Sequence, residues 1–115
     1  MTVSLRGTLE VKEDCQIFRL TGQLDAFSEP TFRKVVSDHL SGGPNHIILD
    51  LTKIDFLDSS GLGSLVQLAK QAKAQSGSLH IVTNPRVTQT VKLVRLEKFL
   101  PLHNNLDEAL AALAS

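Results

Sequence analysis

The hydrophobic pattern opens with two segments of strand type. The first alternates apolar with polar residues, as a strand with one buried face does; its apolar residues are Val3, Leu5, Leu9 and Val11. The second ends near residues 22–25 and carries Ile17, Phe18, Leu20 and Leu24. We expect these two segments to form a pair of antiparallel strands.

A helical pattern and a buried-strand pattern come next. The helix is predicted to follow Ser28, a favourable N-cap, and Pro30, which a first turn tolerates. Its helical spacing is carried by Phe32, Val35, Val36, His39 and Leu40, and residues 41–44 end it. The β-branched run at residues 46–51 is typical of a central strand covered on both faces.

Helices and strands continue to alternate along the chain. A second amphipathic helix follows residues 58–63, closes at Gly77, and has an apolar stripe made of Leu62, Leu65, Val66, Ala69 and Ala72. Residues 79–83 are predicted as a strand, and Asn84-Pro85 as the start of a helix. The apolar face of that helix holds Val87, Val91 and Val94.

The last two elements are short. Residues 99–103 contain Pro101, which cannot donate to a strand ladder, so we expect a short strand at an edge. A small amphipathic helix then carries Leu106, Ala109, Leu110 and Leu113. The element order predicts an α/β fold: one domain over residues 1–115, with a mixed, mostly parallel sheet and about four helices in a common layer.

Composition narrows the function classes. The 115 residues are 42% hydrophobic and 21% charged, which is typical of a globular protein. Twelve basic residues balance twelve acidic ones, and the aromatics are five Phe with no Trp or Tyr, which argues against a nucleic-acid partner. One cysteine, Cys15, allows no internal disulfide, and no apolar run is long enough for a membrane span or a leader, so we expect a cytoplasmic protein.

The sequence offers little for catalysis. The four histidines, His39, His46, His80 and His103, fall in separate elements without metal-ligand spacing, so neither a metal nor a cofactor is expected. Gly61 and Gly63 follow a strand and open a helix as in a dinucleotide fingerprint, but Val66 stands where its third glycine would be. No histidine near Ser59 or Ser60 would serve as a base for a nucleophilic serine.

The most informative segment lies between the central strand and the second helix; it reads Asp58-Ser59-Ser60-Gly61-Leu62-Gly63. Serine at a helix start is a favoured N-cap worth about 1 kcal/mol, and an aspartate suits the same end. Two adjacent hydroxyls exceed the needs of one cap, and the glycines would leave a low surface where a partner could dock. A phosphorylated serine there would add negative charge beside Asp58, with Asp55 near in sequence and Asp25 expected near in space.

These residues, with the apolar strand at 47–51, resemble the STAS domain of bacterial anti-sigma factor antagonists. A second matching segment is Gly22-Gln23-Leu24-Asp25, and the likeness covers nearly the whole chain. It departs from the family in two places: Gln23 stands where glutamate is frequent, and residues 93–96 lack a glycine that is common near the end of the third helix.

The resemblance implies a non-enzymatic partner-switching regulator. The unphosphorylated protein would bind an anti-sigma factor that is also a serine kinase and so free a sigma factor, and a PP2C-type phosphatase would reverse the phosphorylation. The family's phosphoacceptor corresponds to Ser59. The partner surface would comprise Asp25, Asp58, Ser60, Gly61, Leu62 and Gly63.

Two other hypotheses remain open from the sequence. The chain could be a STAS scaffold or nucleotide-binding module that is never phosphorylated, as its incomplete glycine pattern allows. A small hydrolase would require turnover that depends on Ser59.

Overall fold

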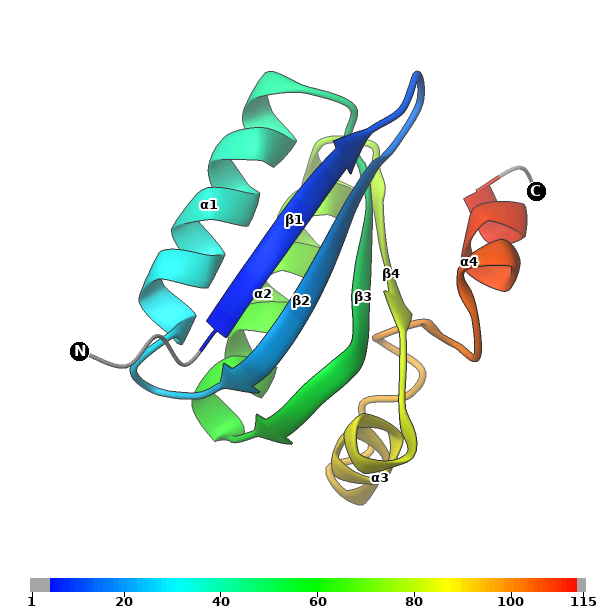
Figure 1. Cartoon of the computed structure of the whole chain (residues 1–115). Helices are drawn as coiled ribbons and strands as arrows, with labels where there is room; N and C mark the ends of the chain where they lie inside the picture. The colour runs from blue at the N-terminus through cyan, green and yellow to red at the C-terminus, as the bar shows by residue number, and fades with distance from the viewer. Residues whose placement is uncertain (1–4, 114–115) are drawn as a thin grey trace.

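The computed structural model describes residues 5–113 and forms one five-stranded sheet in the order β1-β2-β3-β4-β5. Figure 1 labels the first four of these strands. The strands are β1 (Leu5–Val11), β2 (Gln16–Leu24), β3 (His46–Leu57), β4 (Ser78–Val82) and β5 (Leu102–His103). β1 is antiparallel to β2, and the other neighbours are parallel. The mixed, mostly parallel sheet is therefore confirmed, while Val3 of the predicted first strand lies outside the described residues.

Four helices accompany the sheet in the described part of the chain: α1 (Glu29–Gly42), α2 (Ser59–Ala74), α3 (Pro85–Leu93) and α4 (Leu106–Leu113). Their number agrees with the sequence, but the expectation of a common layer was wrong. α1 and α2 lie together on one side of the sheet, and α4 lies on the other (Figure 1). None of the helices within residues 5–113 is long and apolar enough to cross a membrane.

The run of apolar residues in β3 explains the second layer. Ile47, Ile48 and Leu49 are all completely buried although successive side chains of a strand point to opposite faces. Ile47 and Leu49 belong to the main core with α1 and α2, whereas Ile48 packs in a smaller cluster with Ala109 of α4. One layer of helices would have left half of this strand in water, at a cost of about 25 cal/mol per Å² of apolar surface.

Helix starts are anchored by side chains, though not always those expected. Asn84 accepts a hydrogen bond from Val87 N at 2.7 Å and donates to Ile54 O at 2.9 Å, so it both caps α3 and joins it to β3. Ser28 precedes α1 as predicted, but its hydroxyl does not cap the helix. It donates instead to Gln23 O at 2.8 Å, which holds the loop between β2 and α1.

The end of α3 shows what replaces the missing family glycine. Arg95 has a φ of 60°, in the left-handed region that favours glycine. Its amide donates to Lys92 O, and that of Leu96 donates to Val91 O. The helix therefore ends with the backbone geometry that glycine usually supplies, adopted here by an arginine at a conformational cost.

Two histidines from separate elements meet on the sheet. His80 Nδ1 of β4 lies 3.0 Å from His103 Nε2 of β5, and His46 Nδ1 of β3 lies 2.8 Å from Ser78 Oγ of β4. The sequence pattern had left these histidines unconnected. Burial, and then the neighbouring His103 and His46, lower the pKa of His80 below its usual 6.5.

The lowered pKa of His80 predicts that acid destabilises the fold. The unfolded chain takes up this proton first as the pH falls below about 6.5, so the free energy of unfolding is greatest above that pH and declines on acidification. Urea denaturation between about pH 7.5 and about pH 5.5 measures the slope. We expect His80→Gln to flatten it; an unchanged slope in that variant would contradict the assignment.

Candidate functional site

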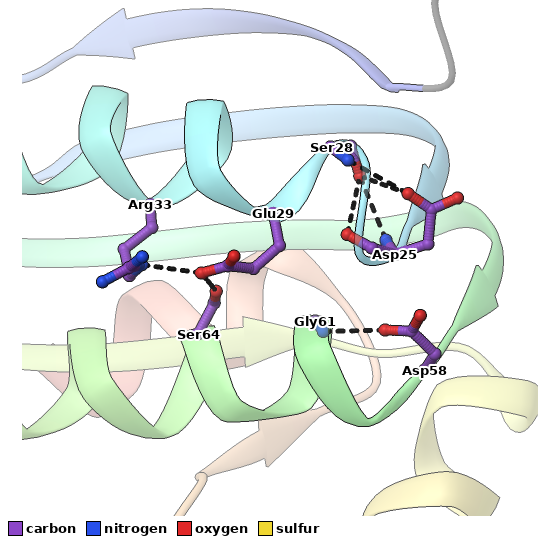
Figure 2. A network of polar contacts seen from close by, with 7 residues as sticks. All are labelled: Asp25, Ser28, Glu29, Arg33, Asp58, Gly61 and Ser64. Carbon is purple, nitrogen blue, oxygen red and sulfur yellow. Dashed lines mark hydrogen bonds and ion pairs between the residues drawn. The ribbon is translucent and has the colours of Figure 1, made fainter.

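Asp58 occupies the junction of β3 and α2 and bonds to two segments of the chain. Its Oδ1 accepts a hydrogen bond from Gly61 N at 2.9 Å, which caps α2, as Figure 2 shows. Its Oδ2 accepts from Ala26 N at 3.1 Å, in the loop between β2 and α1. The predicted closeness of the Asp25 segment to Asp58 is therefore confirmed, and the carboxylate joins the two regions that resemble the family.

Ser59 and Ser60 are the first two residues of α2, at the helix start that the sequence predicted. Neither hydroxyl has a hydrogen-bond partner within residues 5–113, and Ser59 is exposed while Ser60 is half-buried. The interpretation of a serine as the N-cap of α2 was wrong, because the side chain of Asp58 caps this helix. Within the part of the chain that the structure describes, the exposed hydroxyl of Ser59 is thus without a partner.

The two glycines of the motif differ in their surroundings. Gly61 is buried, and a Cβ there would overlap the carbonyl oxygen of Leu24 and lie 2.9 Å from Leu57 Cδ1. Gly63 is exposed, with open space around the corresponding position. The prediction that both glycines leave an accessible surface therefore holds for Gly63 only. The missing side chain of Gly61 instead allows the start of α2 to pack closely against the end of β2.

Leu62 faces inward with Gly61. It is 7% exposed and belongs to the main core. Direct contact with a partner is consequently open to Asp25, Asp58, Ser60 and Gly63, which are exposed or half-buried. Gly61 and Leu62 act on that surface by setting the position of α2.

The loop between β2 and α1 is organised by Asp25. Its Oδ1 accepts hydrogen bonds from Phe27 N and Ser28 N, each at 3.0 Å (Figure 2 draws the contact with Ser28). Phe27, held in this turn, has 92% of its surface exposed. Sequence reasoning missed this residue, although an apolar side chain among polar ones, outside both flanking periodic patterns, was a signal.

A polar contact fixes α1 against α2. Glu29 Oε1 accepts from Ser64 Oγ of α2 at 2.5 Å and from Arg33 Nε at 2.6 Å (Figure 2). The Ser64 hydrogen bond, with Arg33, lowers the pKa of Glu29 despite the opposing effect of burial. The first turn of α1 is therefore held to the second turn of α2 by a charged carboxylate that the sequence pattern did not reveal.

The chemistry that the site offers is limited to a few groups. In the described part of the chain, no group of three or more His, Cys, Asp or Glu side chains is placed to hold a metal ion. The Ser59 hydroxyl donates no hydrogen bond to a base among those residues. What the geometry provides is an accessible hydroxyl at a helix N-terminus and a hydrogen-bonded loop with an exposed aromatic ring.

Comparison with known proteins agrees with this geometry. The family model described as the STAS domain matches residues 8–109. The anti-sigma F factor antagonist of Paenibacillus polymyxa is 28% identical over 113 residues, covering 96% of this chain and 97% of its own.

Solved structures share the fold. An anti-sigma factor antagonist from Mycobacterium paratuberculosis has a TM-score of 0.87 at 24% identity, covering 97% of this chain and 96% of that one. The phosphorylated form of the Bacillus cell fate determinant SpoIIAA has a TM-score of 0.71 at 23% identity, covering 93% of this chain and 98% of that one. At these identities the likeness establishes the fold alone.

The two glycines provide a matched test of the site's packing. Gly61→Ala should lower the free energy of unfolding by about 1–3 kcal/mol, because the new methyl group overlaps the end of β2. Gly63→Ala should raise it by about 1 kcal/mol, since alanine is the better helix former and nothing obstructs it. Urea denaturation of both variants measures the difference; equal stabilities would refute the close approach at Gly61.

Proposed function

The chain belongs to the STAS domain family, and on that premise we propose that it is a non-catalytic anti-sigma factor antagonist controlled by phosphorylation of Ser59. In its unphosphorylated form it binds an anti-sigma factor that is also a serine kinase, and a sigma factor is released. A PP2C-type phosphatase restores the binding form. The switch operates in the cytoplasm through one domain, residues 1–115. The observation that carries the proposal is the exposed, unbonded hydroxyl of Ser59 at the start of α2.

The choice of Ser59 over Ser60 rests on accessibility. A kinase must bring the acceptor hydroxyl to its own catalytic groups, and Ser59 is the more exposed of the two. Asp58 keeps the helix capped whether or not Ser59 carries a substituent. The names of the compared proteins add support, since they include an anti-sigma F factor antagonist and a phosphorylated form of SpoIIAA.

The folded structure can accept a phosphate on Ser59. The positive end of the α2 dipole favours an anion there, and the first amide N–H groups of a helix have no acceptor within the helix. A phosphate adds nearly two negative charges close to Asp58, whose carboxylate remains occupied by two amides. We therefore expect phosphorylation to alter the surface charge with little effect on the fold.

A partner that binds the unphosphorylated surface would lose affinity when Ser59 is phosphorylated. Its contact area would include Asp25, Asp58, Ser60 and Gly63, with Phe27 as an exposed apolar residue. Aromatic side chains that are exposed in the free protein and buried in a complex contribute much of the binding energy. A negative charge in such an interface lowers the affinity when no cation faces it. The charge is desolvated, and the partner's groups there are complementary to an uncharged hydroxyl.

The alternative of a nucleotide-binding module that is never phosphorylated has less support from the geometry of the site. Gly61 N, which a phosphate would need in a glycine-rich cradle, already donates to Asp58 Oδ1. Gly61 itself is buried against Leu24 and Leu57. The alternative of a scaffold that is never phosphorylated is distinguished by the first experiment below.

Phosphorylation at Ser59 is tested with the serine kinase that is the chain's own binding partner, together with ATP. Intact-mass measurement should show one added phosphate on the parent protein and on Ser60→Ala, and none on Ser59→Ala. Phosphate that persists in Ser59→Ala would refute the site. No phosphate on a parent protein that still binds the kinase would favour the unphosphorylated scaffold.

Partner affinity is tested by calorimetric titration with the same anti-sigma factor. We expect Ser59→Asp and Phe27→Ala each to weaken the complex by about tenfold or more, equivalent to ~1.4 kcal/mol, with the melting temperature of the free protein little changed. Phe99→Ala serves as the control, because Phe99 is also exposed but lies between α3 and β5. Equal affinities for the Phe27 and Phe99 variants would contradict the proposed surface.

A further inference from the structure

β1 is the outermost strand on its side of the sheet. It pairs with β2 on one side, and no other strand within residues 5–113 pairs with its outer edge (Figure 1). Every residue of the strand after Leu5 is exposed. The outward backbone groups of such an edge can form a further ladder with another strand.

The residues of β1 are arranged symmetrically about Thr8. Leu5 and Val11 end the strand at equal distances from this centre, and Arg6 and Glu10 flank it at two residues on either side. In an antiparallel pair of identical strands related by a twofold axis at Thr8, each Arg6 faces a Glu10 of the other copy. We propose that β1 is a self-association edge on which a second copy of this chain pairs antiparallel about Thr8, joining the two sheets.

The charges of Arg6 and Glu10 favour this register over the neighbouring registers of the strand pair. A shift of two residues places Arg6 or Glu10 opposite Thr8, and a shift of four sets Arg6 against Arg6 or Glu10 against Glu10. Facing side chains of an antiparallel pair lie about 5 Å apart at Cβ, so like charges there repel. The register about Thr8 is the one that pairs opposite charges and uses all seven residues of the strand.

The ion pairs within one copy leave Arg6 available. Glu10 is bonded to Arg19 at 2.9 Å and lies 3.5 Å from Lys12, and these cations lower its pKa. Arg6 has no acidic partner among residues 5–113. Exposed ion pairs contribute little free energy each, so Arg6 and Glu10 set the register, and the backbone ladder with its apolar contacts supplies the stability.

Apolar side chains on the opposite face of β1 also gain cover. Leu9 is 36% exposed and Val11 58% exposed. In the proposed register Val11 faces Leu5 of the second copy, and Leu9 faces Gly7 of the second copy. The side chain of Leu20 covers Gly7, since a Cβ at Gly7 would lie 2.6 Å from Leu20 Cδ2. Leu9 therefore meets an apolar surface there.

These contacts continue an existing groove. An open groove of about 1160 Å³ runs between β1 and α1, lined on the sheet side by Leu5, Leu9 and Phe18 and on the helix side by Phe32 and Val35. Pairing about Thr8 joins the grooves of the two copies edge to edge. The zero formal net charge of the chain adds no general repulsion between copies.

Charge reversal tests the pairing by sedimentation over a concentration series of the full chain. We expect the parent to dimerise, and Arg6→Glu or Glu10→Arg to weaken the dimer by about tenfold or more, because each creates two like-charge pairs. The double variant Arg6→Glu, Glu10→Arg should restore dimerisation. Lys70→Glu, an exposed cation on α2, should change nothing, and urea denaturation of each variant confirms that it is folded.

Cysteine cross-linking tests the register. Thr8→Cys should form a disulfide-linked dimer under mild oxidation, since the two Thr8 positions face each other, and Val11→Cys, opposite Leu5, should link much more slowly. Cys15 is fully buried and does not compete. A protein that stays monomeric, a dimer insensitive to charge reversal, or equal cross-linking at both positions would each overturn the proposal.

Discussion

The Asp58 carboxylate is the interaction on which the arrangement of the site depends. It satisfies Gly61 N at the start of α2 and Ala26 N in the loop after β2. Loss of the acceptor for the buried Gly61 amide would cost about 1–3 kcal/mol, whereas the hydrogen bond to the exposed Ala26 amide contributes less. Because Asp58 caps the helix, the exposed Ser59 hydroxyl is not needed as a cap and has no hydrogen-bond partner among the described residues.

The elements around Ser59 are held together by packing and hydrogen bonds, and this bears on how a switch would work. Gly61 packs α2 against Leu24, and Glu29 ties α1 to Ser64. A phosphate on Ser59 would therefore change charge at a fixed position rather than release an element of the fold. Phe27, presented by the Asp25 turn, is the most exposed of the large apolar side chains in the described part of the chain.

Tertiary structure also gives the two sides of the sheet different roles. α1 and α2 build the side that carries Ser59 and Phe27, while α4 closes the other side over Ile48 and Val82. The hydrophobic run of β3 already required cover on both faces, but its sequence did not say which helix would provide the second layer. A short helix at the end of the chain can reach either face, so its position depends on the path after β5.

The sequence by itself determined the elements, their order and the place of residues 58–63 at a helix start, because hydrophobic periodicity and cap chemistry act over a few residues. Only the tertiary structure decided that Asp58 caps α2, that Gly61 is buried and Ser59 free, and that His80 meets His103. These outcomes depend on the register of distant strands and on the contact of Leu24 with α2. The cap preferences of neighbouring Asp and Ser are too similar to decide which residue caps the helix. The approach of the Ala26 segment, which also bonds to Asp58, decides it.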